Sequence, residues 1–368
     1  MERQMRGHAG DGDELASIII VLYNSSRYIE PCIESIMRQD YPHEIIAVDN
    51  NSRDDSCQIL REKYPHVRLI KNQENAGYGA GNNEGVKYAS GKYIVILNPD
   101  TIVEERWLRE LIEPLRNEDK LITTPKILTY DGELINTCGA INHFSGLTFT
   151  RGLGCPIDMP FCKTRVSGFS GCSFAIRRDL YLSLGGFDQR FFMYNDDADL
   201  SWRANLNGFK ILYIPQSIVK HDYTLKMSPK KLYHLEKGRY TILRKYLSTE
   251  CLLLLGPSLL ITEILTFGFA SRHGIAYLYN KMLAMLHGLT DEITPVKGNS
   301  HLLIGSLDDR IPDDQLTTYK LDVFIIRSIN FIYSFNFSCL KAIKMSYQKQ
   351  IEKRVLQISH RLLNNPVD

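Results

Sequence analysis

The chain has 368 residues, of which 44% are hydrophobic, and a formal net charge of +2 at neutral pH. This length provides enough apolar material for a buried core and suggests about two domains. A charge so close to zero argues against general binding to nucleic acid, although the stretch 341–361 is rich in lysine and arginine. The eight cysteines form no C-x-x-C pair, so we expect free thiols in a reducing compartment.

The first 14 residues are polar and charged, and they contain no apolar segment of the kind that a secretory signal needs. Three glycines lie among these charges, which favours a flexible tail. We therefore expect ordered structure to begin near residue 15, and we expect the protein to be cytoplasmic.

Strand and helix patterns alternate over the first hundred residues. Apolar runs at 17–23, 44–48, 67–70 and 93–97 predict buried strands. Apolar residues at helical spacing between these runs predict helices at 27–39, at 56–63 and up to residue 89. This alternation is typical of an α/β fold with a mostly parallel central sheet flanked by helices.

After residue 100 the alternation weakens. Helices are predicted at 107–115, from 179 and at 196–207, and strands at 121–128, 173–176 and 210–214, with a further strand ending at 221. The stretch 135–154 is predicted to be rich in hairpins, and the pattern beyond about residue 228 is mainly helical. The predicted organisation is a tail (1–14), an α/β domain (15–228) and a mainly helical region (229–368).

Two stretches of the helical region could contact a membrane. Residues 251–270 are long enough to span one, but Pro257 and Glu263 favour burial in a helical domain or a position on a bilayer surface. The stretch 230–247, KKLYHLEKGRYTILRKYL, places basic residues among tyrosines and leucines at near-helical spacing. Docking to an anionic membrane face and ordinary packing on the first domain are both open for it.

Polar residues follow several predicted strands, at the edge where open α/β sheets bind ligands. Asn24 and Asp49 follow the first two strands, and Asp100 follows the fourth within the segment NPDT. Asp49 suits either an Asx-turn or a carboxylate that accepts a hydrogen bond from a nucleobase. Asp100 and the imidazole of His221, with a diphosphate, would suit Mg²⁺ or Mn²⁺, although an isolated histidine is more often structural.

The segment NAGYGAGNNEG at 75–85 contains a cluster of glycines. A dinucleotide-binding fingerprint starting at Gly77 would need glycine at position 82, where this chain has Asn82, and it would follow the first strand rather than the third. A dehydrogenase site is therefore disfavoured. Gly77 and Gly79 favour a tight loop that lets the backbone approach a ligand.

The segment FFMYNDDADLSW at 191–202 places three carboxylates directly after an apolar run. Acids this close repel one another unless a cation or a proton relieves them. On a helix, Asp196 and Asp199 share a face while Asp197 points elsewhere. One interpretation is an acidic first turn that the helix dipole stabilises. The other makes Asp197 a general base, with the aromatic side chains excluding water.

Taken in order over residues 15–225, these motifs resemble the inverting glycosyltransferases of family 2, which have the GT-A fold, and especially the rhamnosyltransferase-like members. The segments that carry the resemblance are SIIIVLYNSSRYIEPCIESI, IIAVDNNSRDDS, ENAGYGAGNNEGVKYASGKYIVILNPDT and SGFSGCSFAIRRDLYLSLGGFDQRFFMYNDDADLSWRANLNGFKILYIP. The resemblance implies transfer of one sugar from a nucleoside-diphosphate donor to a glycan or lipid-linked acceptor, in the synthesis of cell-surface polysaccharide or glycoconjugate.

The resemblance also implies roles for single residues. It makes Asp197 the catalytic base, and Asp100 and His221 the ligands of Mg²⁺ or Mn²⁺. Nucleotide contacts are expected from Asn24, Asp49, Gly77, Gly79 and Asn98, and acceptor contacts from Gly171, Cys172, Asp196 and Trp202. The sequence departs from the family pattern at two positions: Asn98 and Asp196 stand where that pattern often has Asp and Glu, respectively. The amide at Asn98 brings no charge, which lowers the expected metal affinity.

Two other functions are compatible with the same fold. A processive polysaccharide synthase would have a Q-x-x-R-W motif, which this sequence lacks. A non-catalytic nucleotide-sugar-binding protein would be expected to lose the base or the metal-binding acid, and both are present. Rhamnose from a thymidine diphosphate donor fits the resemblance, but the donor, the acceptor, the linkage and the oligomeric state are open. We expect peripheral contact with the cytoplasmic face of a membrane.

Overall fold

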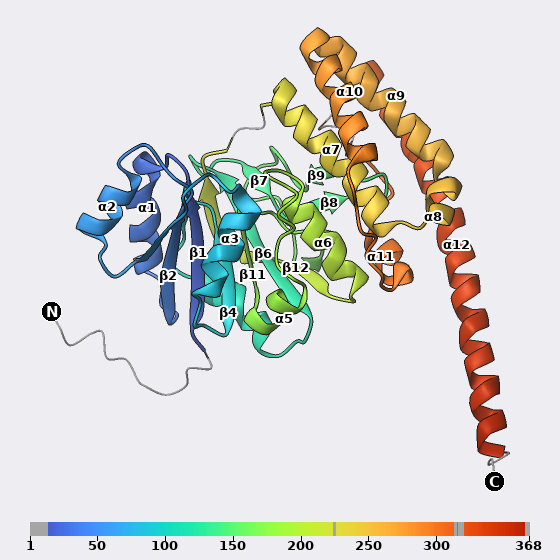
Figure 1. Cartoon of the computed structure of the whole chain (residues 1–368), viewed down its shortest axis with the longest axis horizontal. Helices are drawn as coiled ribbons and strands as arrows, with labels where there is room; N and C mark the ends of the chain where they lie inside the picture. Colours follow the sequence, from blue (N-terminus) through green and yellow to red (C-terminus); the bar gives the residue numbers. More distant parts are fainter. Residues whose placement is uncertain (1–13, 224–225, 313–314, 316–319, 365–368) are drawn as a thin grey trace.

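The computed structural model describes residues 14–223, 226–312, 315 and 320–364, so the predicted tail lies outside it except for Glu14. A mixed sheet forms the centre of the molecule, helices cover both of its faces, and a layer of helices lies at one end (Figure 1). The sheet contains β1 (Ala16–Leu22), β2 (His43–Asp49), β3 (Arg68–Lys71), β4 (Tyr93–Leu97), β5 (Thr101–Val103), β6 (Leu121–Thr129), β7 (Ile135–Thr137), β10 (Thr164–Arg165), β11 (Ser173–Arg177) and β12 (Lys210–His221).

The predicted strand and helix alternation is confirmed in the first hundred residues. Strands β3, β2, β1 and β4 lie side by side in that order and are all parallel. The sheet becomes mixed beyond β4, because β11 runs antiparallel to both β4 and β6. The hairpin-rich stretch contains β8 (Ala140–Asn142) and β9 (Thr148–Thr150), which pair with each other.

Strand β12 corrects one prediction. The sequence pattern predicted two strands, at 210–214 and ending at 221, but the structure has a single strand whose register against β6 shifts between Ile214 and Ile218. Pro215 lies in this interval and has no N–H to donate to the ladder. A bulge therefore interrupts the pairing without ending the strand.

The helices of the α/β part are α1 (Ser26–Met37), α2 (Ser56–Lys63), α3 (Tyr78–Lys87), α4 (Trp107–Ile112), α5 (Arg178–Ser183) and α6 (Asp196–Leu206). The predicted helical region contains α7 (Pro229–Tyr246), α8 (Thr249–Leu254), α9 (Gly256–His273), α10 (Ile275–Thr290), α11 (Ser300–Ser306) and α12 (Lys320–Asn364). Its mainly helical character is confirmed.

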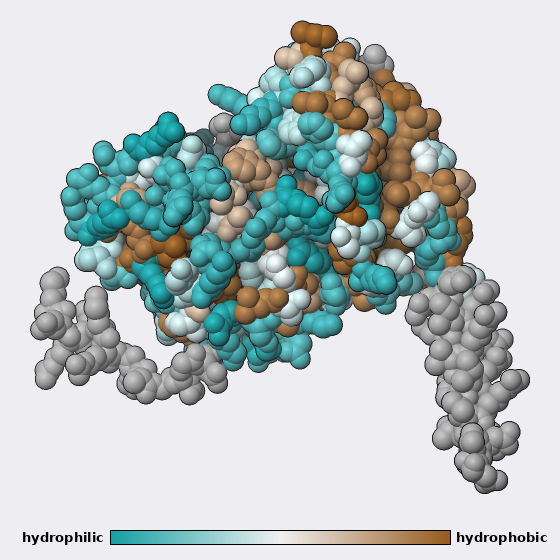
Figure 2. Space-filling view, viewed as in Figure 1, coloured by the Kyte–Doolittle hydropathy of each residue, from teal (hydrophilic) through white to brown (hydrophobic). Residues whose placement is uncertain are grey.

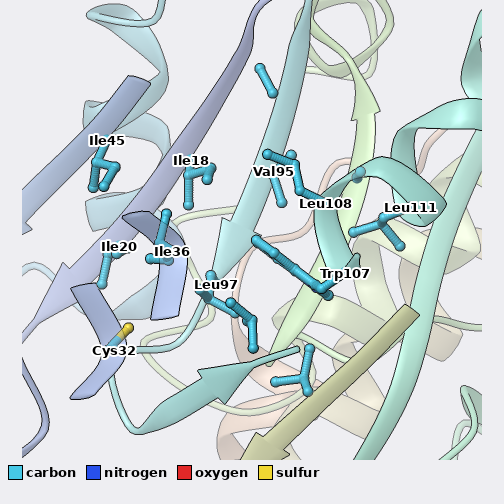
Figure 3. Packing of buried hydrophobic residues seen from close by; sticks show 14 of the residues in the cluster. Ile18, Ile20, Cys32, Ile36, Ile45, Val95, Leu97, Trp107, Leu108 and Leu111 are labelled. Atoms are coloured by element: carbon cyan, nitrogen blue, oxygen red, sulfur yellow. The ribbon is translucent and has the colours of Figure 1, made fainter. Parts of the chain in front are cut away.

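Apolar residues fill both faces of the sheet because neighbouring side chains of a strand point to opposite sides. Ile18 and Ile20 of β1 pack with Trp107 of α4 in one cluster, shown in Figure 3. Ile19, between them, packs on the opposite face with Phe174 of β11. Burial on both faces explains why these strands are continuous apolar runs rather than alternating ones.

A third cluster joins the α/β part to the helical region. Trp202 of α6 and Phe144 pack there with Ile242 of α7, Leu303 of α11 and Tyr333 of α12. This core crosses the boundary at residue 228 that the sequence suggested, so α7, α11 and α12 are packed against the α/β part. The domain boundary itself stays a prediction.

Buried ion pairs connect α7, α9 and α10. Arg239 of α7 donates to Glu236 at 2.8 Å and to Glu263 of α9 at 2.5 Å, and Lys281 of α10 also donates to both carboxylates. Burial raises the pKa of Glu263, but Arg239 and Lys281 outweigh it and lower this pKa to about 2. The four side chains carry balanced charge, which burial requires.

These contacts bear on the two stretches for which membrane contact was predicted. Residues 251–270 are divided between α8 and α9, with Pro257 in the first turn of α9 and Glu263 directed at protein cations. Residues 230–247 form most of α7, whose basic residues Arg239 and Lys245 are buried. Packing on the first domain is therefore the interpretation that the structure supports for α7.

Candidate active site

The predicted nucleotide-binding residues at the ends of β1 and β2 belong to two neighbouring loops that hydrogen bonds connect. Asn24 has a left-handed backbone with φ of 51°, and its Oδ1 accepts a hydrogen bond from the N–H of Arg53 at 2.8 Å. Oδ1 of Asp49 accepts from the N–H of Ser52 at 3.0 Å, which forms the Asx-turn. The turn leaves the other carboxylate oxygen of Asp49 free of this role, so its contact with a nucleobase stays a prediction.

The predicted metal ligands come from two neighbouring strands. Asp100 precedes β5, and β12 pairs with β5 so that His221 is opposite Thr101. Nε2 of His221 lies 3.2 Å from Oδ1 of Asp100 and 3.5 Å from Nδ2 of Asn98. The structure thus brings together side chains that are more than a hundred residues apart in the sequence.

These side chains fit a divalent cation in two respects. Oδ1 of Asn98 and Oδ1 of Asp100 are buried without a hydrogen-bond partner, and Oδ1 of Asp100 faces Nε2 of His221. A separation of 3.2 Å between the Asp100 and His221 atoms matches adjacent ligand positions around an octahedral ion, which are about 3 Å apart for bonds of about 2.1 Å. No cluster of three or more His, Cys, Asp or Glu side chains occurs among the described residues, so further ligands would come from substrate or water.

The imidazole of His221 is 5% exposed and lies between Asp100, Cys172 and the ring of Tyr223. Burial lowers the pKa of His221, whereas Cys172 and Asp100 raise it, and the resulting pKa is about 10. Burial raises the pKa of Cys172, so its thiol stays protonated. The Asp100 carboxylate thus favours a positive charge beside it, which a proton on the imidazole or a bound divalent cation in place of that proton supplies.

The glycine loop packs tightly on the segment that precedes α6. Gly77 has φ of 87°, and a Cβ at this position would lie 2.4 Å from the carbonyl oxygen of Phe192. That oxygen also accepts a hydrogen bond from the N–H of Tyr78 at 3.0 Å. A Cβ at Gly79 would lie 2.8 Å from Cβ of Phe187. Protein packing thus explains both glycines, and their contact with a nucleotide stays a prediction.

A strained turn delivers the acidic segment to the site. Tyr194 and Asn195 both have left-handed backbones, with φ of 63° and 60°. Such conformations are uncommon for residues other than glycine, and two in succession need support from their surroundings. Nδ2 of Asn195 supplies it by donating to the carbonyl oxygen of Leu235 on α7 at 2.7 Å. Helix α6 then begins at Asp196.

The cost of burying three carboxylates at the start of α6 is offset differently for each of them. Asp199 is fully buried and accepts from Arg203 and from Lys245 of α7, each at 2.6 Å. Asp196 is 4% exposed, its Oδ2 has no partner, and burial followed by the charge of Asp197 raises its pKa well above the ordinary value, which favours a bound proton.

Asp197 differs from its two neighbours because each of its carboxylate oxygens accepts a backbone hydrogen bond and neither is paired with a cation. Its Oδ2 accepts from the N–H of Gly171 at 2.9 Å, and its Oδ1 accepts from the N–H of Ala198 at 2.8 Å. Burial raises the pKa of Asp197, while these N–H groups lower it, and the net shift is upward. A partly exposed carboxylate with a raised pKa and no bound cation is suited to accept a proton.

Gly171 and Cys172 link this carboxylate to the Asp100 side of the site. Gly171 donates to Asp197 and accepts from the hydroxyl of Tyr78, while the carbonyl oxygen of Cys172 accepts from the N–H of Asn98 at 2.9 Å. A Cβ at Gly171 would lie 3.4 Å from Oδ2 of Asp197. These contacts connect Asp197 to Asn98, beside Asp100 and His221, and the action of these residues in one site stays a prediction.

Trp202 does not belong to this site. It is 1% exposed and packs in the third apolar cluster, with its ring centroid 6.0 Å from that of Tyr246. The prediction that it contacts an acceptor is wrong, because position 202 lies on the face of α6 that is covered by α7. Asp196 and Cys172 are also buried, whereas Gly171 is half-buried beside Asp197, and acceptor contacts of these three residues stay predictions.

The sequence reasoning missed Lys231, which lies 7% exposed at the start of α7. Its Nζ donates to the hydroxyl of Tyr223 and lies 5.1 Å from the ring centroid of Tyr194 and 4.8 Å from that of Tyr223. The Tyr223 ring stacks on His221 at 5.4 Å. The sequence does show a lysine ten residues after His221. The basic residues around it, however, predicted only a helix that docks to a membrane or packs on the first domain.

Comparison with known proteins assigns the site to a family. The model of the family described as glycosyl transferase family 2 matches residues 17–185. The chain carries a domain of glycosyl transferase family 2. The matched residues include the glycine loop, Asp49, Asp100 and Gly171, while Asp197 and His221 lie beyond them.

Curated relatives share this family 2 domain. The chain is 30% identical over 226 residues to the O-antigen biosynthesis protein RfbC of Myxococcus xanthus, which covers 57% of this chain and 17% of RfbC. It is 31% identical over 122 residues to the glycosyltransferase GlyG of Streptococcus pneumoniae, covering 32% and 40%. It is 23% identical over 205 residues to a poly-beta-1,6-N-acetyl-D-glucosamine synthase of Staphylococcus epidermidis, covering 55% and 48%. The alignments therefore span less than half the length of these relatives.

Solved structures of GT-A glycosyltransferases share the fold. GalNAc-T7 in complex with UDP, GalNAc and Mn²⁺ matches with a TM-score of 0.56 at 17% identity, over 76% of this chain and 55% of that one. TarS 1-349 of S. aureus matches with a TM-score of 0.50 at 17% identity, over 91% of both chains. The GT-A fold predicted from the motifs of this family 2 domain is thus confirmed.

We expect Gly77→Ala to destabilise the family 2 domain more than Gly154→Ala does. Both positions have positive φ, which costs about 1–2 kcal/mol with a Cβ, but only at Gly77 would the Cβ also meet a backbone oxygen. That clash adds about 1–3 kcal/mol. Chemical unfolding of both variants measures the difference, and equal losses would contradict the tight contact between the glycine loop and Phe192.

Proposed function

We propose that the protein is an inverting, metal-dependent glycosyltransferase that moves a single sugar from a nucleoside-diphosphate donor to a glycan or lipid-linked acceptor in cell-surface polysaccharide synthesis. The observation that carries the proposal is the hydrogen-bonded connection from the Asp197 carboxylate through Gly171 and Cys172 to Asn98, beside Asp100 and His221. It joins a candidate base, Asp197, to a candidate diphosphate site whose Asp100 lies within the residues that the family model matches.

Asp197 is proposed as the catalytic base. The acceptor hydroxyl attacks the anomeric carbon on the face opposite the diphosphate, and Asp197 takes the hydroxyl proton. A bond from the anomeric carbon to the acceptor oxygen forms while the bond to the diphosphate oxygen breaks, so the anomeric configuration inverts. The pKa of Asp197 is raised above that of a solvated aspartate, which makes it a stronger base than such a residue.

The departing nucleoside diphosphate carries negative charge that the site must stabilise. Asp100 and His221, helped by the amide oxygen of Asn98, would hold Mg²⁺ or Mn²⁺, which when bound offsets this charge as a Lewis acid. The Nζ of Lys231 lies between two tyrosine rings on the same side as His221. We propose that Lys231 contributes a second positive charge to the leaving group.

The donor and the location are the least constrained parts of the proposal. GalNAc-T7 is described with UDP, GalNAc and Mn²⁺, which supports a nucleotide-sugar donor and a divalent cation for this chain. Rhamnose from a thymidine diphosphate stays a prediction. The names of RfbC and of the N-acetylglucosamine polymer synthase support a role in polysaccharide synthesis. A location at the cytoplasmic face of a membrane stays a prediction. Metal-dependent turnover of a panel of nucleotide sugars tests the whole proposal.

Replacing Asp197 with asparagine is expected to lower the transfer rate by about 100-fold or more, because the amide cannot take the acceptor proton. Donor binding, measured by calorimetry, should be unchanged. In the wild-type enzyme the active form is the deprotonated carboxylate, so the rate should fall as the pH falls through the raised pKa of Asp197. Asp179→Asn, on the exposed surface of α5, is the matched control. Unchanged transfer in Asp197→Asn would remove this residue from its proposed role.

Removal of divalent cations by a chelator is expected to abolish donor turnover, and added Mn²⁺ should restore it. His221→Ala should need an Mn²⁺ concentration at least about tenfold higher for the same turnover, because one ligand is lost. The exposed His66→Ala provides the control for loss of an imidazole elsewhere in the domain. Full turnover by the wild type in chelator would contradict metal dependence.

Lys231→Met should weaken nucleoside-diphosphate binding by about 10-fold to 100-fold, since a hydrogen bond to a charged group contributes about 1.5–3 kcal/mol. Thermal unfolding should not reveal a loss of stability, because burial already lowers the pKa of Lys231 and methionine has a similar shape. Lys230→Met changes the same charge at the adjacent, exposed position of α7. Equal nucleotide affinities of the two variants would exclude Lys231 from the diphosphate site.

A further inference from the structure

The helical layer exposes large apolar side chains on the side away from the sheet. Figure 2 shows hydrophobic side chains gathered over α9, α10 and the described part of α12. We define this apolar face by six residues whose side chains are 56–76% exposed: Leu260, Ile264, Tyr279, Leu286, Phe331 and Phe335. A helix that contacts only water on its outer side would be expected to carry polar residues there.

Helix α12 is apolar on two opposite sides. Its inner side contributes Tyr333 and Phe337, both buried in the third apolar cluster, while Phe331 and Phe335 point outward. In the part of the chain that the structure describes, Val323–Ser346 of α12 is long and apolar enough to cross a membrane. If α12 crossed a membrane, its inner side chains would have to leave the third apolar cluster. If α12 lies along the membrane surface, the cluster stays intact. The two-sided pattern therefore favours a position parallel to a surface.

Charge around the apolar face is one-sided. The segments 251–290 and 323–346, which supply most of α8 to α10 and the described outer side of α12, contain a single acid, Glu263. That carboxylate is paired with Arg239 and Lys281 inside the protein. Helix α12 continues from this face through residues 341–361, whose sequence contains six lysine or arginine residues and one acid. An apolar surface accompanied by cations, with its one carboxylate neutralised, is complementary to anionic lipid.

We propose that α9, α10 and α12 seat the protein on an anionic lipid bilayer, with the apolar face buried at the level of the headgroups and the outer acyl chains. Helix α12 lies along the bilayer surface rather than across it. The proposal deepens the membrane location included in the proposed function and replaces α7 as the contacting element. The proposal depends on the proposed function in one respect only: membrane binding would give the enzyme access to an acceptor held in the same membrane surface.

The first test is flotation of the full chain with lipid vesicles. We expect the protein to float with vesicles that contain phosphatidylglycerol, to float less with pure phosphatidylcholine, and to be partly released by high salt. Absence of flotation with the anionic vesicles would overturn the proposal, whatever the outcome of the transfer assays.

The second test compares two variants with the same type of substitution. Phe331→Glu with Phe335→Glu places charge on the apolar face and should reduce the bound fraction at least about tenfold, because two large side chains lose their burial in lipid. Leu182→Glu, at a 58% exposed position of α5 in the family 2 domain, should float like the wild type. Donor hydrolysis in solution should be equal in all three proteins, which separates a failure of membrane binding from a failure of catalysis.

A second copy of the chain is the competing occupant of the apolar face. Light scattering during size-exclusion chromatography, without lipid, distinguishes it. The membrane proposal would be overturned by two results together. The wild type would be an oligomer that Phe331→Glu with Phe335→Glu converts to a monomer, and flotation would be unaffected by these substitutions. The apolar face would then be a self-association surface.

Discussion

The active site depends on keeping three carboxylates together at the start of one buried helix. Removing an ionised carboxylate from water is costly unless charge or hydrogen bonds replace the water. Here two cations compensate Asp199, a raised pKa favours a proton on Asp196, and two backbone N–H groups stabilise Asp197. This division leaves one carboxylate of the three free of both a cation and a favoured proton, and that one borders the predicted metal site.

Helix α7 supplies much of this compensation from outside the domain matched by the family model. Lys245 pairs with Asp199, the carbonyl oxygen of Leu235 supports the left-handed turn at Asn195, and Lys231 reaches the Tyr223 side of the site. The helix is in turn fixed to α9 and α10 through Arg239. The helical region is therefore part of what shapes the site, and a chain truncated after the α/β part would leave Asp199 buried without one of its two cations.

The sequence predicted the elements of the sheet well because burial on both faces produces continuous β-branched runs, as in β1 and β4. It also predicted that Asp100 and His221 approach each other, since both follow strand-like runs at one edge. It failed where the outcome depends on which neighbour covers a face. The family resemblance implied that Trp202 contacts the acceptor, yet its side of α6 is covered by α7. Lys231 was hidden among basic residues because only the folded chain distinguishes its buried position from the exposed Lys230.

The bulge in β12 determines which side of the sheet its last residues present. Three residues, 215–217, lie between the two registers against β6. Because three is an odd number, odd-numbered residues point to one face of the sheet before this interval and to the other face after it. Ile211 and Tyr213 pack in the cluster with Phe174, whereas Val219 packs in the cluster with Trp107. His221 is two residues after Val219 in the same strand and therefore points to the same face of the sheet. A slip of one residue in the pairing after this interval would turn the imidazole toward the other side of the sheet, so the spacing around Pro215 is as important to the site as the identity of its ligands.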